Sequence, residues 1–155
     1  MRGSIRQRVA GALLNVARIG QAQAFFGNVY EAVVKVPHTY AHDRSLAGRP
    51  GLRPGSPTLY FVPAGPLTFV ASVGALAAGR ERGWLAASTA ATGAAGVLTA
   101  YVVTKVNKRL FLDEEPPTPE ERDALLRRWY RLNAARIVMV GTAWFAAERA
   151  RGSAV

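Results

Sequence analysis

The sequence has no cysteine and few acidic residues, and each shortage excludes a class of protein. With no cysteine among 155 residues, a disulfide scaffold, a thiolate nucleophile and a cysteine-ligated zinc or iron–sulfur centre are excluded. Ten acidic residues stand against 20 basic ones, giving a net charge of +10 and a pI near 11.0. Such a charge is typical of nucleic-acid-binding proteins. Half of the residues are hydrophobic, however, and the length fits one domain rather than a multidomain enzyme.

Charge is missing altogether from two long segments. Residues 58–79 and 83–104 are each uncharged over 22 positions. At about 1.5 Å per helical residue, either segment is long enough to cross a hydrocarbon core of about 30 Å. Because only Arg80-Glu81-Arg82 separates them, they are predicted to form a transmembrane helical hairpin. In a soluble bundle of this size, the rest of the chain would be too short to cover so much apolar surface.

The segments on either side are apolar but carry interrupting polar residues, which in a membrane bundle can face the interior. We therefore predict an all-α fold, a four-transmembrane-helix bundle. It forms a single domain over residues 1–155, with spans near 9–35, 58–79, 83–105 and 128–148. Asn15 and Arg18 interrupt the first apolar stretch, so a cleaved secretory signal is not expected.

Location and orientation follow from the spans and the cations. We predict a multi-pass protein of a bacterial-type inner (plasma) membrane, with the lipid bilayer as its partner and a homo-oligomer left open. Arginines at both ends of the chain and in the hairpin turn favour cytoplasmic termini. Nucleic-acid binding is not expected, because the cations flank apolar spans and form no basic domain with interleaved aromatic residues.

Two proline residues and one threonine predict local features. Pro63 and Pro66 in the second span predict a kink that either opens space between helices or is tolerated without a ligand. Thr118, followed by Pro119, Glu120 and Glu121, is typical of a helix start.

Polar residues recur at helical spacing in three of the spans. The predicted faces are Asn15, Arg18, Gln21, Asn28, Glu31 and Lys35; Thr92, Gly96, Thr99, Val103 and Asn107; and Trp129, Asn133, Arg136 and Val140. If they converge, the bundle has a polar interior near one end that contains Asn28, Glu31, Asn107, Asn133 and Arg136. Two interpretations stay open. Glu31 and Arg136 form a structural ion pair among interhelical hydrogen bonds, or these costly buried charges mark a site.

The only histidines, His38 and His42, are spaced four residues apart. If the helix continued past Pro37, both rings would lie on one face and, with Glu31 or Asp43, hold a divalent metal. The alternative is a pair of interfacial side chains at the depth of the lipid headgroups.

Four stretches together resemble the integral membrane family known as DUF1772, or anthrone oxygenase-like. They are GNVYEAVVKVP from Gly27, SPTLYFVPAGPL from Ser56, the threonine-rich third span ending at Asn107, and RRWYRLNAARI from Arg127. The resemblance implies a four-helix membrane protein that oxidises an anthrone to an anthraquinone with no evident organic cofactor. The positions that match family signatures are Asn28, Tyr30, Glu31, Trp129, Asn133 and Arg136. The histidine pair is not part of the family pattern.

This resemblance and the polar faces predict an enzyme that oxidises a lipophilic aromatic substrate between the helices. Glu31 is expected to remove a proton, while Arg136 with Asn28 or Asn133 stabilises the enolate oxygen. Residues predicted to contact the substrate are Tyr30, Asn107, Trp129 and Tyr60. Other functions stay open: a non-catalytic scaffold or partner subunit, a metal-dependent membrane oxidase using His38 and His42, and a channel or carrier.

Overall fold

The computed structural model describes residues 2–43, 45 and 61–152, with side chains from residue 5 onward. Within these ranges the chain is helical, without strands, as predicted. Its elements are α1 (Arg2–Val33), α2 (Val36–His42), α4 (Ala64–Ala78), α5 (Arg82–Val102), η1 (Val103–Leu112) and α6 (Pro119–Gly152). Tyr60, predicted to contact a substrate, lies outside the described residues.

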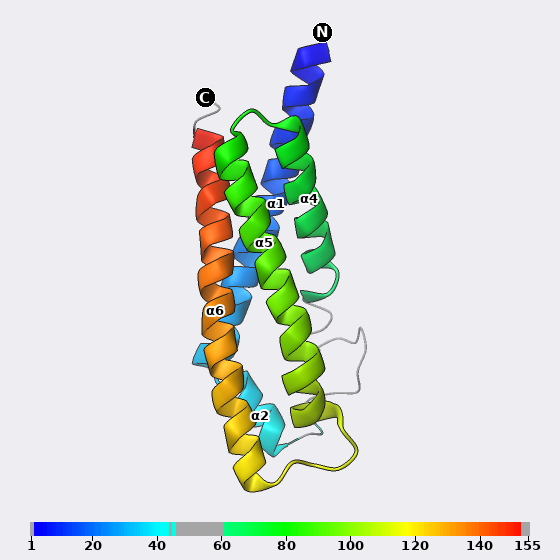
Figure 1. Cartoon of the computed structure of the whole chain (residues 1–155), viewed down its shortest axis with the longest axis vertical. Coiled ribbons are helices and arrows are strands. Elements are labelled where there is room, and N and C mark those ends of the chain that lie inside the picture. The colour runs from blue at the N-terminus through cyan, green and yellow to red at the C-terminus, as the bar shows by residue number, and fades with distance from the viewer. Residues whose placement is uncertain (1, 44, 46–60, 153–155) are drawn as a thin grey trace.

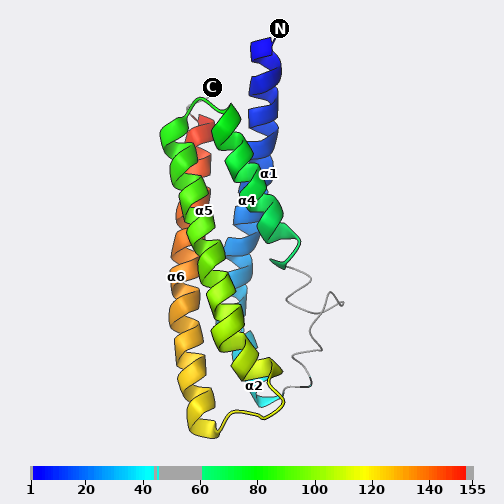
Figure 2. The ribbon, with the colours of Figure 1, turned by 45° about the vertical axis from the view of Figure 1, so that its right-hand side comes forward.

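Helices α1, α4 and α6, together with the continuous helix formed by α5 and η1, pack side by side, each antiparallel to the next (Figure 1). Helices α1 and α4 pack together, as do α4 and α5, α5 and α6, and α6 and α1, so that they form a closed four-sided bundle. Helix α1 begins and α6 ends at the same end, next to the α4–α5 turn (Figure 2). This is called the termini end, and the opposite end, where α2 lies, is called the α2 end.

The helix boundaries correct several of the predicted ones. Helix α1 begins at Arg2 and ends at Val33 rather than spanning 9–35, because Lys35 adopts a left-handed conformation with φ 55°. The prolines mark an interruption rather than a kink within a span: Phe61 is helical, residues 62–63 form a turn, and α4 begins at Ala64 with Pro63 at its N-cap. In the first helical turn a proline removes no intrahelical hydrogen bond. The predicted helix start at Thr118 is confirmed: its Oγ1 accepts from the Glu121 backbone N–H at 3.3 Å.

The third helix runs further than its predicted end at 105 and changes its winding. From Val103 to Leu112 the backbone is π-helical (η1), and its last link runs from the Asp113 N–H to the Lys108 carbonyl at 3.0 Å. Because a π-helix has more residues per turn than an α-helix, it rotates the following side chains around the axis. The predicted face is only partly right: Gly96, in α5 ahead of the π-helix, and Val103 are exposed, while Val102 and Val106 are fully buried.

Small and polar side chains fill the interior of the bundle. Alanines make up nine of the sixteen buried hydrophobic residues in the described ranges, and the buried polar residues are Gln21, Asn28, Thr68, Ser72, Ser88, Asn133 and Arg136. Large apolar side chains lie outside, for example Val97 at 74%, Ile19 at 70% and Phe145 at 59% exposed. This distribution is the reverse of that expected for a helical bundle in water. It resembles membrane bundles, where small residues let helices approach closely.

Only one described helix, Arg82–Leu112, is both long and apolar enough to cross a membrane, and α4 is apolar over a shorter length. Helices α1 and α6, with 32 and 34 residues, are long enough at about 1.5 Å per residue but more polar. The all-α fold is confirmed, and the four-transmembrane-helix bundle stays a prediction.

Helices α1 and α4 touch most closely at Gly20. A methyl group added there would overlap Thr68 Oγ1 and lie 3.0 Å from Thr68 Cβ. The Thr68 hydroxyl is itself fixed, because it donates to the Ala64 carbonyl at 2.7 Å. Since the two helices run antiparallel, α4 begins near the level of Ala24 and does not extend as far as Asn28.

Gly20→Ala is therefore expected to destabilise the bundle by about 1–3 kcal/mol through overpacking. The measurement is the thermal unfolding midpoint of the purified protein in detergent. Gly96→Ala is the control, because nothing lies within 4 Å of the added carbon. Equal midpoints for the two variants would contradict the close packing at Gly20.

A second contact closes the α2 end. The Arg109 guanidinium, on η1, donates to both carboxylate oxygens of Glu121, on α6, at 2.6 Å each, and to the Glu115 carbonyl at 2.9 Å. The hydrogen bond from Arg109 lowers the pKa of the Glu121 carboxyl. This bidentate link holds the connection between η1 and α6 in place.

Because the folded-state pKa of Glu121 is lowered, the stability that this link contributes is present at neutral pH and is lost as the pH falls through that lowered pKa. NMR titration of the Glu121 carboxyl carbon is expected to give a midpoint below the ordinary glutamate value. In Arg109→Gln the midpoint should rise toward that value. An unchanged midpoint in Arg109→Gln would show that Arg109 does not set the titration.

Candidate functional site

The site is built on one face of α6. Trp129, Asn133, Arg136 and Val140 are spaced by four, three and four residues, so they share a face, and all four are buried as predicted. Trp129 anchors the face by packing against Val102 and Val106 of the third helix. The guanidinium of Arg136 lies over the Trp129 ring, 5.6 Å from its centroid. Position and direction of the arginine are thus set by an aromatic surface.

A chain of hydrogen bonds connects this face to α1. The Asn133 amide donates to the backbone carbonyl of Asn28 at 2.9 Å, and Arg136 donates to the Asn133 side-chain oxygen at 2.6 Å. The Asn28 amide donates to the Ala24 carbonyl at 2.8 Å. Asn133, Asn28 and Arg136 are 1%, 4% and 7% exposed. We call these three residues the polar link.

Two atoms of the polar link have no partner within the described residues. They are Asn28 Oδ1, an acceptor, and Arg136 Nε, a donor, and both are enclosed. An enclosed polar atom without a partner costs about 1–3 kcal/mol. The link therefore keeps a free acceptor and a free donor in a setting where hydrogen bonds are strong.

Glu31 lies beside this link without closing it. Its carboxylate interacts electrostatically with Arg136. However, Glu31 and Arg136 are not among the ion pairs that lie within 4.0 Å in the described residues. The structural ion pair considered for these residues is therefore not formed as a direct contact.

The other predicted residues are distributed unevenly around the link. Asn107, on η1, has a buried side-chain oxygen that, among the described residues, finds no partner. Tyr30 is 64% exposed on the outer surface of α1, so it does not share the buried face. Helices α1 and α6 bring Glu31, Asn28 and Asn133 together. Tyr30 lies apart from them.

The histidine pair lies at the α2 end. The helix is interrupted at Lys35 and does not continue from α1 past Pro37. Within α2 the His38 and His42 rings still stack, with centroids 6.3 Å apart. His38 Nδ1 lies 3.1 Å from the Tyr130 hydroxyl, and His42 Nδ1 lies 2.8 Å from the His38 carbonyl. In the described ranges no group of three or more His, Asp or Glu is placed to hold a metal ion. Metal binding by the pair stays a prediction.

Two polar contacts, one buried and one half-buried, were not predicted. Gln21, one of the polar residues of α1, reaches across the bundle and donates to Ser88 Oγ at 2.9 Å and Thr92 Oγ1 at 3.0 Å. Arg18 pairs with Glu148 of α6, whose carboxylate also accepts from the Trp144 indole at 3.1 Å. Gln21 and Thr92 each lie on a predicted polar face, but spacing within one helix does not show which residues of another helix it meets.

The polar link predicts non-additive stability changes. Asn133→Leu should lower the thermal midpoint, because it leaves the buried Arg136 guanidinium with fewer partners. Adding Arg136→Met should recover part of that loss, because no buried charge remains without a partner. The readout is thermal unfolding of the two single variants and the double variant. Simple addition of the two single losses would contradict the coupling.

Comparison with known families gives one match. The family model described as anthrone oxygenase matches residues 57–146, which include Trp129, Asn133 and Arg136 and leave Asn28 and Glu31 outside. The comparisons with curated proteins and with solved structures give no match.

Proposed function

This chain belongs to the anthrone oxygenase family, and from that premise we propose that it is a small membrane oxygenase that oxidises a lipophilic anthrone-type substrate at the polar link. The observation that carries the proposal is the pair of enclosed, unpartnered atoms, Asn28 Oδ1 and Arg136 Nε, next to the Glu31 carboxylate. A non-catalytic scaffold would account for the hydrogen bonds between α1 and α6. Gln21, Asn107 and Arg122 also have an enclosed atom without a partner among the described residues, so the position of Asn28 Oδ1 and Arg136 Nε beside a carboxylate is what favours an enzyme.

Membrane insertion is part of the proposal. It is supported by the alanine-rich interior, by the large apolar side chains on the outside and by the apolar helix Arg82–Leu112. Four passes would place the termini and the arginine-rich termini end on one side, which is cytoplasmic by the positive-inside rule. A lipophilic substrate would then reach the site from the bilayer by passing between helices.

The free atoms of the link suit a phenol-bearing enolate. A substrate hydroxyl would donate to Asn28 Oδ1, and the developing enolate oxygen would accept from the Arg136 Nε–H. A fixed guanidinium in an enclosed setting stabilises such a charge more strongly than water does, because it does not have to reorient. Since both atoms are enclosed, substrate binding requires local separation of α1 and α6.

In the proposed reaction Glu31 acts as the base. It removes a proton from the substrate methylene, and the carbanion adds to dioxygen and takes the proton back as a hydroperoxide. Removal of the second C–H proton then breaks the O–O bond, leaving a carbonyl on the substrate and releasing hydroxide, which becomes water. In total a methylene and dioxygen give a carbonyl and water. Dioxygen is the oxidant.

Glu31→Gln is expected to lower kcat for an anthrone-type substrate by about 10²–10⁴-fold, the range for loss of a general base. The rate is measured as quinone formation by purified protein, corrected for spontaneous oxidation of the substrate. Glu148→Gln is the matched control: its carboxylate also lies between α1 and α6, but it already pairs with Arg18. Its kcat should stay within about threefold of the parent.

Turnover by Glu31→Gln at the parent rate would remove Glu31 as the base. Circular dichroism of each variant shows whether the helices are intact, so that a folding defect is not read as lost catalysis. If Glu148→Gln, with its helices intact, lost as much activity as Glu31→Gln, the effect would belong to the α1–α6 interface and not to Glu31.

A further inference from the structure

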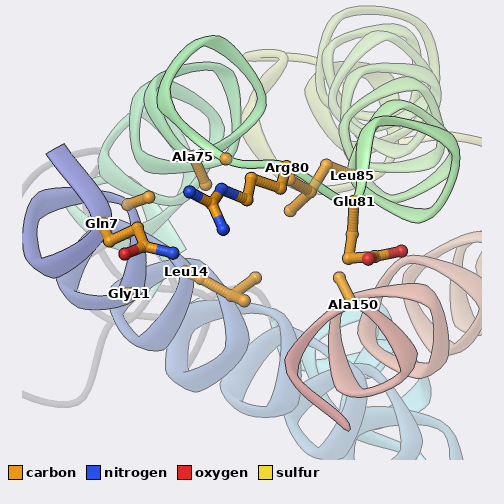
Figure 3. A pocket seen from close by; sticks show the side chains of 10 residues that line it. Gln7, Gly11, Leu14, Ala75, Arg80, Glu81, Leu85 and Ala150 are labelled. Atoms are coloured by element: carbon orange, nitrogen blue, oxygen red, sulfur yellow. The ribbon is translucent and has the colours of Figure 1, made fainter. Parts of the chain in front are cut away.

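A hollow lies at the termini end, away from the polar link. This pocket has a volume of about 510 Å³ and is bounded by α1, the α4–α5 turn and the last turns of α6 (Figure 3). Its floor is apolar, with Leu14, Ala75, Leu85 and Ala150, of which the last three form a buried cluster. The pocket therefore opens at the termini end of the bundle and has an apolar base.

The polar side chains of the pocket divide between two sides. The Arg80 guanidinium extends across the mouth toward Gln7, and the Glu81 carboxylate lies on the opposite side, near Ala150 (Figure 3). In the described part of the chain, the Arg80 side chain makes no hydrogen bond or ion pair with another residue. The arginine is therefore free to bind a ligand.

Cations outnumber the single carboxylate around this mouth. An adjoining hollow of about 420 Å³ shares Gln7, Gly79 and Arg80 with the pocket and adds Arg6 and Arg82. Arg6 is fixed there, because it donates to the Ala77 carbonyl at 2.9 Å, at the end of α4. Three arginines with one carboxylate on the far side make the mouth favourable for an anion.

We propose that this pocket binds a phosphate-bearing anion, the headgroup of an anionic phospholipid. Guanidinium groups bind phosphate through paired N–H donors, and the Gln7 amide supplies a further donor. The apolar floor accepts the glycerol and the first acyl carbons. The lipid as occupant rests on the proposed membrane insertion, whereas the anion site does not.

The test is calorimetric titration of the purified full chain in a maltoside detergent with dihexanoyl phosphatidylglycerol. Dihexanoyl phosphatidylcholine and inorganic phosphate are the comparison ligands. Phosphatidylglycerol should bind most tightly. Arg80→Gln should weaken it about tenfold, or about 1.4 kcal/mol. Arg8→Gln is the matched control, because it removes the same charge at the same end but lines neither hollow; it should weaken binding by no more than about twofold.

A second pair of variants tests the pocket without changing charge. Nothing lies within 4 Å of a carbon added at Gly11, which lines the pocket, or at Gly83, which does not. Gly11→Phe should therefore fill the hollow and abolish phosphatidylglycerol binding, while Gly83→Phe should bind as the parent does.

Three results would overturn the proposal. If Arg80→Gln and Arg8→Gln weakened phosphatidylglycerol binding equally, the lipid would be held by diffuse surface charge. If Gly11→Phe bound the lipid as tightly as the parent, the pocket would not be the binding site. Inorganic phosphate bound as tightly as the lipid, with the same dependence on Arg80, would overturn the lipid as occupant. None of these measurements uses turnover. A negative result for the lipid site can therefore be distinguished from a negative result for the role of Glu31.

Discussion

The hydrogen bond from the Asn133 amide to the backbone carbonyl of Asn28 is the contact on which the candidate site depends. It ties α6 to α1, two helices at opposite ends of the sequence, and it fixes the oxygen to which Arg136 donates. Because the acceptor is a backbone carbonyl, the contact sets the height of one helix against the other, whatever side chains surround it. With that register, the Glu31 carboxylate lies beside the guanidinium without pairing with it directly.

Much of this arrangement could be predicted from the sequence because it rests on local rules. The two uncharged runs indicated the central helices, and the spacing of Trp129, Asn133 and Arg136 placed them on one buried face. The capping pattern at Thr118 indicated where α6 starts. Each of these signals is contained in a few neighbouring residues, and so no knowledge of the packing is needed to read it.

Features that depend on packing or on a change of backbone winding could not be predicted. The π-helical turns of η1 change the winding of the third helix without any change in composition, so a constant helical period does not describe its last ten residues. The bond from Gln21 to Ser88 depends on how the bundle closes. The same closure separates two chemically different ends: an enclosed site of polar side chains between α1 and α6, and an open, arginine-rich pocket beside the α4–α5 turn.

The central claim is that the free Arg136 N–H serves a substrate oxygen. It is tested most directly by NMR of protein labelled with ¹⁵N in arginine, observing the Nε–H signals while a hydroxyanthraquinone, a stable product-like ligand, is added. The Arg136 signal is assigned by its loss in Arg136→Lys. The Arg136 signal should shift on titration, while that of Arg109, which is bound to Glu121, should not. Saturable binding that leaves the Arg136 signal in place would contradict it.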